Sequence, residues 1–229
     1  MLMWAGGFGP GIVALFMTGV REDSASLWSR LANWRVGEMW YSLALFLPIF
    51  VVLIAIVAHA ASGGKVYLAT SPGYWALFLV VQLLLAPFFE ELGWRGHLLP
   101  MLLEGKSPLQ ASLILGGAWG LWHLPVRWSQ YSGQLYDFLV FFLIYCSLVT
   151  ALSVVFTWFF LRTHGAIFPV VLLHASYNAM VTFVVNPTAD AQGLGCVLWL
   201  TATMSLAAAI TYWRGGLQPT LSEMPHERT

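Results

Sequence analysis

Long apolar runs recur along this chain of 229 residues, and each run is long enough to cross a lipid bilayer. A transmembrane helix needs about 20 consecutive, mostly apolar residues, and about seven runs meet that requirement. They lie near residues 2–20, 41–61, 74–96, 108–126, 136–161, 166–186 and 193–213. Composition agrees, since 59% of the residues are hydrophobic, 9% are charged and the mean hydropathy is +0.75. We therefore predict an all-α, polytopic transmembrane helix bundle, with residues 1–229 forming a single integral membrane domain.

The N-terminal region combines an apolar run with an amphipathic segment. The first run lacks the basic start and the small-residue cleavage site of a secretory signal, so we interpret it as a retained span. After it, "REDSASLWSRLANWRVGEMW" places Leu27, Leu31 and Trp34 at helical spacing. The same segment carries the basic residues Arg30 and Arg35. This pattern predicts a short helix that lies along the membrane interface.

The basic residues outside the motif described below are divided unequally between the two ends of the predicted spans. Those on one side are Arg21, Arg30, Arg35, Lys106, Arg162, Arg214 and Arg228, and those on the other are Lys65 and Arg127. Because cytoplasmic loops carry an excess of Lys and Arg, we predict a multi-pass protein with a cytoplasmic C-terminus. Net charge is zero, so no basic surface predicts binding to nucleic acid. The expected partner is the membrane lipid bilayer.

An acidic pair interrupts this apolar chain in the stretch "FFEELGWRGH", residues 88–97. A carboxylate at membrane depth costs several kcal/mol or more unless it is paired or hydrated, so such a pair is a candidate functional site. Glu91 and Arg95 stand four residues apart, which favours an ion pair on one helix face. Glu90 points about 100° away from Glu91. The sequence therefore predicts that one carboxylate is neutralised internally and that Glu90 faces another polar group.

Two further helices carry polar side chains at membrane depth. His123 follows Trp119 by one turn near the end of the run at 108–126, and His174 precedes Asn178 by one turn in the run at 166–186. A single histidine of this kind is most often a buried imidazole with a backbone partner. Polar groups on three separate helices are harder to explain in that way, because buried polar networks are demanding to satisfy.

The combination of side chains suits hydrolysis of a peptide bond. A water held between a carboxylate and an imidazole can be deprotonated and directed at a carbonyl carbon. Another histidine and an asparagine amide can donate hydrogen bonds to the oxyanion that develops. The chain contains no HExxH zinc motif, no GxSG serine motif and no pair of membrane aspartates. The residues thus favour an intramembrane endopeptidase.

The chain resembles the CAAX prenyl protease and bacteriocin-processing (CPBP) intramembrane proteases, or type II CAAX endopeptidases. The EExxxR motif of that family matches "EELGWR" at residues 90–95, and its HxxxN motif matches "HASYN" at 174–178. The motif with an aromatic residue four before histidine matches "WGLWH", where Trp119 replaces the more usual phenylalanine. The motifs occur in the family's order within a catalytic core of about 75–185.

That resemblance implies roles for the motif residues. Glu90 and His123 would activate the water, His174 and Asn178 would stabilise the oxyanion, and Glu91 with Arg95 would organise the site. It also implies an eight-helix bundle, of which this chain would lack or shorten the N-terminal helix. The expected substrate is a membrane-associated or lipidated peptide or protein, including prenylated ones.

Two alternatives stay open at this point. Glu90, His123 and His174 could supply the ligands of a catalytic zinc site, so a divalent metal such as zinc is a possible cofactor. We favour direct water activation, because Asn178 beside His174 suits donation to an oxyanion better than metal binding. The alternative function is a non-catalytic membrane scaffold or a transporter-like protein, whose buried cluster binds a proton, an ion or a peptide. The absence of internal repeats disfavours the transporter.

Overall fold

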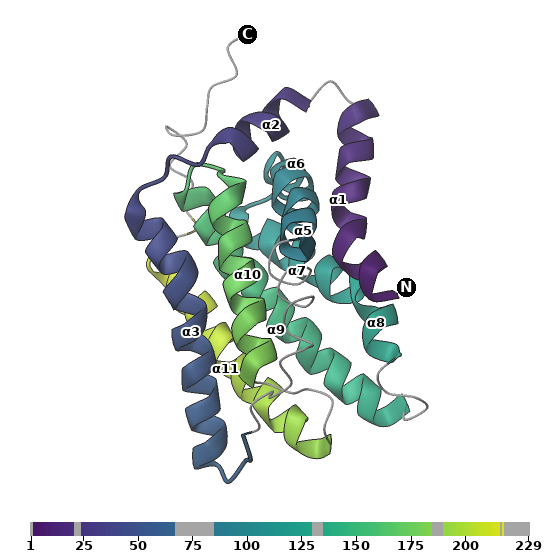
Figure 1. Cartoon of the computed structure of the whole chain (residues 1–229), viewed down its shortest axis with the longest axis vertical. Helices are drawn as coiled ribbons and strands as arrows, with labels where there is room; N and C mark the ends of the chain where they lie inside the picture. Colours follow the sequence, from purple (N-terminus) through teal and green to yellow (C-terminus); the bar gives the residue numbers. More distant parts are fainter. Residues whose placement is uncertain are drawn as a thin grey trace.

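The helices of the chain run mostly along one common axis in the computed structural model (Figure 1). The structure describes residues 2–20, 24–66, 85–129, 135–184, 190–215 and 217. Within these ranges it contains helices and no strand, which confirms the predicted all-α class. The elements are α1 Leu2–Val20, α2 Ser24–Ala32, α3 Glu38–Ala61, α5 Ala86–Gly93, the π-helix η2 Trp94–Leu98, α6 Leu99–Leu103, α7 Pro108–Trp122, α8 Leu124–Trp128, α9 Leu135–Arg162, α10 Ile167–Val184 and α11 Asp190–Trp213.

Three described helices are long and apolar enough to cross a membrane, namely α3, α9 and the part Leu194–Trp213 of α11. Two shorter apolar segments, Phe8–Met17 and Ile167–Thr182, lie in α1 and α10. The predicted span at 74–96 lies partly outside the described residues, which resume at Leu85. The chain is a membrane protein with several apolar helices.

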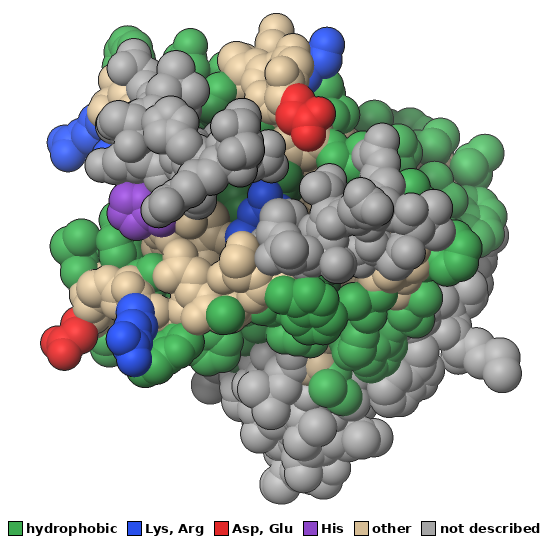
Figure 2. Space-filling view, turned by 90° about the horizontal axis from the view of Figure 1, so that it is seen from above, with side chains coloured by type: hydrophobic (Ala, Val, Ile, Leu, Met, Phe, Trp, Pro, Cys, Tyr) green, Lys and Arg blue, Asp and Glu red, His purple; other side chains and the backbone are tan. Residues whose placement is uncertain are grey.

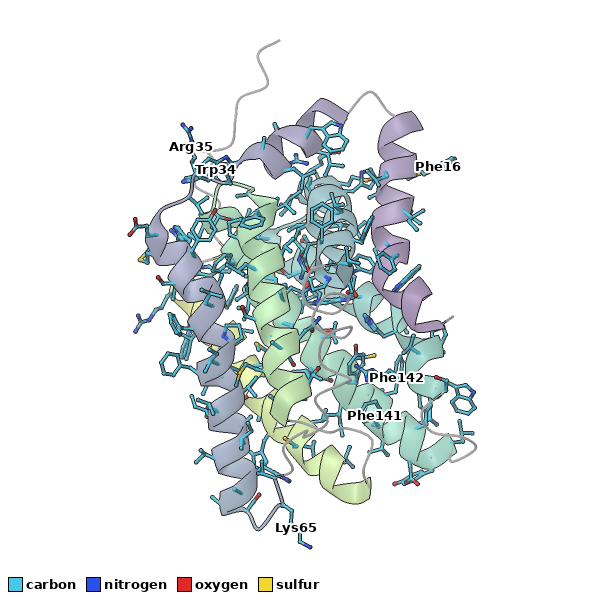
Figure 3. All side chains as sticks on the ribbon, in the orientation of Figure 1. Phe16, Trp34, Arg35, Lys65, Phe141 and Phe142 are labelled. Carbon is cyan, nitrogen blue, oxygen red and sulfur yellow. The ribbon has the colours of Figure 1, made fainter. Side chains whose placement is uncertain are left out.

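The outer face of α3 carries large apolar side chains that suit contact with lipid and not with water. Its exposed large side chains include Phe46, Phe50, Ile54 and Val57, each more than half exposed. They recur at spacings of three and four residues and therefore form one stripe. Phe16 of α1 likewise points away from the bundle (Figure 3). An apolar stripe of this size suits contact with lipid chains.

Figure 2 looks onto the end of the bundle that carries α2, where charged side chains lie among polar atoms and hydrophobic side chains lie along much of the rim. Arg35 lies at this end, and Lys65 lies at the opposite end (Figure 3). The sequence assigned these two residues to opposite sides of the membrane.

The predicted interfacial helix is present as α2, which runs across this end of the bundle (Figure 1). Leu27 is buried and Leu31 is partly buried, as the pattern predicted. The prediction was wrong for Trp34, which follows the helix and is 59% exposed. The helix ends at Ala32, and residues 33–37 adopt no regular structure. The buried face of α2 is therefore shorter than the sequence pattern suggested.

The acidic motif lies on a continuous helical path from Ala86 to Leu103, which extends beyond the predicted end near residue 96. After Gly96 the chain carries no Asp, Glu, Lys or Arg before Glu104, and the helical path runs on to Leu103. Its middle is a π turn, in which the Leu99 amide donates to the Trp94 carbonyl five residues earlier. Such turns occur mostly as single insertions in helices and are frequent at functional sites.

A proline explains how α2 is attached to this helix. Pro100 has no N–H to donate to the Gly96 carbonyl four residues before it. Arg30 of α2 donates a hydrogen bond to that carbonyl at 3.1 Å. A Cβ atom on Gly96 would lie 2.7 Å from the Leu27 side chain, so the glycine permits the close approach. Thus α2 covers the end of the motif helix through one polar and one apolar contact.

Glycines bring the other helices of the site close together. On α1, a Cβ atom at Gly11 would lie 2.5 Å from the Phe89 carbonyl oxygen of α5. On α7, a Cβ atom at Gly116 would lie 2.6 Å from the Thr150 Cα of α9, and one at Gly120 would lie 3.0 Å from the Cys146 sulfur. Small residues at such spacing let membrane helices pack backbone to backbone. This packing sets the position of the C-terminal end of α7, where His123 lies.

Candidate active site

The three predicted motifs converge from different helices. Helix α5 and the π turn carry Glu90, Glu91 and Arg95, the end of α7 carries Trp119 and His123, and α10 carries His174 and Asn178. These helices surround the middle of the bundle in Figure 1. Direct contacts join Glu91, Arg95 and His174 in one group and Glu90 with Trp119 in another.

Glu91 is completely buried and has two partners on one oxygen. Its Oε1 accepts a hydrogen bond from the Arg95 Nη1 at 3.1 Å and another from the His174 Nδ1 at 2.8 Å. The predicted ion pair with Arg95 is therefore present. The bond from His174 was not predicted, and it connects α5 with α10 across 83 positions of sequence. A buried carboxylate needs such partners, because its desolvation is costly.

The Arg95 side chain is also fully buried, and two aromatic rings enclose it. Its guanidinium carbon lies 4.8 Å from the centroid of the Trp119 ring and 4.9 Å from that of the Phe156 ring. A cation over an aromatic face is attracted by the ring quadrupole, more strongly where water is excluded. The His174 ring packs edge-on against the same two aromatic residues, at 5.2 and 5.6 Å between centroids. Glu91, Arg95 and His174 thus form a closed cluster.

Glu90 has a separate partner, as the helical geometry predicted. Its Oε2 accepts a hydrogen bond from the Trp119 Nε1 at 2.8 Å, and the residue is 5% exposed. The indole N–H is a donor only, so Glu90 can accept this bond as a carboxylate. One oxygen of Glu90 is held in place by this bond. The adjacent glutamates therefore lie in different environments.

His123 follows α7 and is partly buried, as is Asn178, whereas the other motif residues are buried. Its Nδ1 lies 2.9 Å from the backbone carbonyl oxygen of Trp119. Because a carbonyl only accepts, Nδ1 must carry the proton, and Nε2 of the neutral ring then holds a lone pair. Trp119 consequently holds both candidate water-activating groups, Glu90 through its indole and His123 through its backbone.

Asn178 lies one turn beyond His174 on α10 and is partly buried. Its amide makes no hydrogen bond to any residue that the structure describes. The structure therefore places Asn178 on the expected helix without joining it directly to the other motif residues. Among the described residues, no group of three or more His, Cys, Asp and Glu side chains has the spacing of a metal site.

Two aromatic residues of the site were missed by the sequence reasoning. Phe156 covers Arg95, and the Tyr145 ring lies 5.9 Å from the His123 ring in an edge-on contact. Both belong to α9, which is rich in aromatic residues along its whole length. Nothing in the sequence separates these two from their neighbours, because their roles depend on which helices pack against α9.

Comparison with known proteins agrees with the motifs. Residues 72–180 match the family described as type II CAAX prenyl endopeptidase Rce1-like. A CAAX prenyl protease 2 from Methanococcus maripaludis is 28% identical over 136 residues, which cover 56% of this chain. The chain spans half of the length of that relative. All the motif residues fall inside the matched region, and the predicted family resemblance is confirmed. By its motifs, its helices and these matches, the chain resembles the Rce1-like family of type II CAAX prenyl endopeptidases over residues 72–180.

Proposed function

We propose that this protein is an intramembrane endopeptidase in which Glu90 and His123 activate a water molecule for attack on a peptide carbonyl. The observation that carries the proposal is the double role of Trp119, which binds the Glu90 carboxylate through its indole and the His123 ring through its carbonyl. One residue thereby fixes a carboxylate and an unprotonated imidazole nitrogen on neighbouring helices. Both groups are proton acceptors of the kind that general base catalysis requires.

The proposed reaction is ordinary hydrolysis. The water oxygen bonds to the carbonyl carbon while its proton passes to the Glu90 carboxylate or the His123 Nε2. The carbonyl oxygen takes the negative charge, and His174 and Asn178 donate hydrogen bonds to it. When the C–N bond breaks, the proton held by the base passes to the departing amine, and the base returns to its starting state.

The bond between His174 and Glu91 bears on the role of His174. Because Nδ1 donates to the carboxylate, Nε2 can donate to an oxyanion only when the ring carries both protons. The fully buried Glu91 holds the ring in this orientation through the same bond. Glu91 and Arg95 would therefore act by orienting His174, and not by contacting the substrate.

The same geometry is also found around metal-binding histidines, whose second nitrogen often donates to a carboxylate. In a zinc site, His174 would bind the metal through Nε2, together with Glu90 and His123. We favour the metal-free reaction, because Asn178 beside His174 suits donation to an oxyanion better than metal binding. Purified protein assayed with a strong chelator, and analysed for bound metal, separates the two. Activity in metal-free protein excludes the zinc route, whereas loss of activity with rescue by zinc alone overturns our preference.

The substrate class follows from the family and the setting. We propose that the substrate is a membrane-associated peptide or protein that carries a prenylated cysteine before the cleaved bond. A prenyl chain would hold the substrate at the bilayer, where the lipid-facing helices of this chain also lie. Membranes containing the wild type or the Glu90→Gln variant can be compared by terminal proteomics. New termini that appear only with the wild type support the proposal, and identical profiles contradict it.

We further propose that the end of the bundle with α2 and Arg35 faces the cytoplasm, as does the C-terminus. The unequal distribution of basic residues supports this orientation. A single cysteine placed after residue 217, in a variant without Cys146 and Cys196, can be labelled in intact cells. A cytoplasmic C-terminus stays protected from an impermeant thiol reagent, and labelling from outside contradicts the orientation.

A further inference from the structure

Arg127 is a basic side chain one turn beyond His123. It belongs to the short helix α8, and its backbone amide donates to the His123 carbonyl at 2.9 Å. The sequence pattern assigned it to a loop outside the membrane. The structure instead buries it partly and places its guanidinium carbon 4.4 Å from the centroid of the Tyr145 ring on α9. The position of this cation is thus fixed relative to the candidate active site.

Aromatic contacts hold this region in place. Tyr145 stacks on Phe141 and Phe142, at 6.0 and 6.4 Å between ring centroids, and both phenylalanines point from α9 in Figure 3. Trp128, the residue after Arg127, packs edge-on against Phe138 at 4.8 Å. The contact between Trp128 and Phe138 joins α8 to α9 beside the arginine, and the stacking within α9 supports the Tyr145 ring. The Arg127 guanidinium accordingly packs against a group of aromatic side chains on α9.

The distance from His123 to Arg127 has a definite upper limit. The Tyr145 ring lies 5.9 Å from the His123 ring and 4.4 Å from the Arg127 guanidinium carbon. These separations place the guanidinium no more than about 10 Å from the imidazole, so three extended residues are long enough to reach it from His123. A CAAX sequence has three residues after its cysteine. A peptide cleaved beside His123 would therefore bring its C-terminal end close to Arg127.

The chemistry of an arginine fits that end. Helix α7 is about 22 Å long, which is shorter than the ~30 Å hydrocarbon core of a bilayer, so a helix that starts at one surface ends with His123 still within the bilayer thickness. Charged residues at such depth face a polar cavity or a partner of opposite charge. The guanidinium presents its donors in a planar fork that matches a carboxylate, more closely than a lysine ammonium does.

We propose that Arg127 binds the free C-terminal carboxylate of the substrate and so selects peptides that end three residues after the cleaved bond. This inference rests on the proposed endopeptidase function and specifies its substrate. It implies that the released fragment is a tripeptide with its own carboxylate on Arg127. A peptide with a C-terminal amide lacks the charge, and a longer tail carries the carboxylate past the guanidinium.

The experiment uses matched farnesylated peptides that differ only at the C-terminus, which is either a free acid or a carboxamide. Wild-type protein in lipid vesicles should cleave the acid with a kcat/KM about 10- to 100-fold above that of the amide. In Arg127→Gln this ratio should fall to about one, mainly because KM for the acid rises. Arg127→Lys should give an intermediate ratio, since an ammonium keeps the charge without the fork.

Arg35→Gln is the matched control, because Arg35 also lies over an aromatic ring, that of Trp34, but is exposed and outside the site. It should leave the acid-to-amide ratio unchanged. If Arg127→Gln fails to fold, the acid-to-amide ratios of the wild type and of Arg127→Lys still test the inference. Equal cleavage of acid and amide by the wild type, or a ratio preserved without Arg127, overturns the inference but leaves the endopeptidase function standing. Failure to cleave either peptide overturns both.

Discussion

Glu90 and Glu91 are neighbours in the chain, yet their surroundings differ in almost every respect. Glu91 is fully buried and binds a cation and an imidazole, whereas Glu90 is slightly exposed and binds only the neutral indole of Trp119. The first environment neutralises a charge, and the second leaves a charge available. Adjacent positions on a helix point about 100° apart, so a single turn can serve both purposes. The comparison supports our proposal that Glu91 has a structural role and that Glu90 takes part in the reaction.

The comparison is tested most severely by Glu90→Gln. The amide oxygen can still accept the hydrogen bond from Trp119, so the fold should be kept. The side chain can no longer take a proton from water, and cleavage should fall by about 1,000-fold. Peptide cleavage in vesicles and thermal unfolding in detergent measure the two effects. A variant that cleaves at the wild-type rate would remove Glu90 from the proposed reaction.

The opposite outcome is expected for Arg95→Ala. It leaves the Glu91 carboxylate buried without its cation, which should cost about 3–5 kcal/mol of folding free energy. Arg162→Ala is the control, because Arg162 is exposed at the end of α9 and should cost little. The melting temperatures of both variants are compared with that of Glu90→Gln. Equal loss of stability in Arg95→Ala and Glu90→Gln would abolish the distinction between the two carboxylates.

A third test concerns the close contact between α7 and α9, which positions Trp119 and His123. Gly116→Ala would place a methyl group 2.6 Å from the Thr150 Cα and should separate α7 from α9. We expect a loss of about 1–3 kcal/mol together with reduced cleavage, since Trp119 and His123 follow on the same helix. Gly117→Ala is the matched control, because a Cβ atom there would meet nothing within 4 Å. It should be neutral or slightly stabilising. Identical behaviour of the two variants would show that this contact does not set the site.

Much of this arrangement could be predicted from helical spacing alone. The separation of the two glutamates and the Glu91–Arg95 pair follow from residues on one helix, where spacing fixes direction. The bond from His174 to Glu91 and the cover of Arg95 by Phe156 could not be predicted, because they depend on which helix faces which. The same limit applies to Arg127, whose place beside Tyr145 depends on how α8 turns back against α9.

Local backbone chemistry explains the other differences. The motif helix continues beyond residue 96 through a π turn, which the apolar pattern does not reveal. Trp34 is exposed because α2 ends two residues before it, in a segment whose apolar spacing still resembles a helix. Spacing predicts which residues share a face, but it does not predict where a helix ends or widens.

The smallest expected effect concerns the hydrogen bond that marks Glu90 as the available carboxylate. Trp119→Phe removes the indole N–H and keeps an aromatic ring over Arg95 and a backbone carbonyl for His123. A hydrogen bond to a charged group contributes about 1.5–3 kcal/mol, but water can replace part of it at a slightly exposed carboxylate. We therefore expect kcat/KM to fall by about tenfold with little change in melting temperature.

Trp213→Phe is the matched control for this change, because Trp213 is 91% exposed at the end of α11. It should leave both kcat/KM and melting temperature unchanged. Phenylalanine is the more usual residue of the family motif at position 119, so the ring itself should suffice for the fold. If Trp119→Phe cleaves as fast as the wild type, the indole bond does not orient Glu90, and its position must come from the packing of α5 alone. If melting falls as far as in Arg95→Ala, Trp119 belongs with the closed cluster around Glu91.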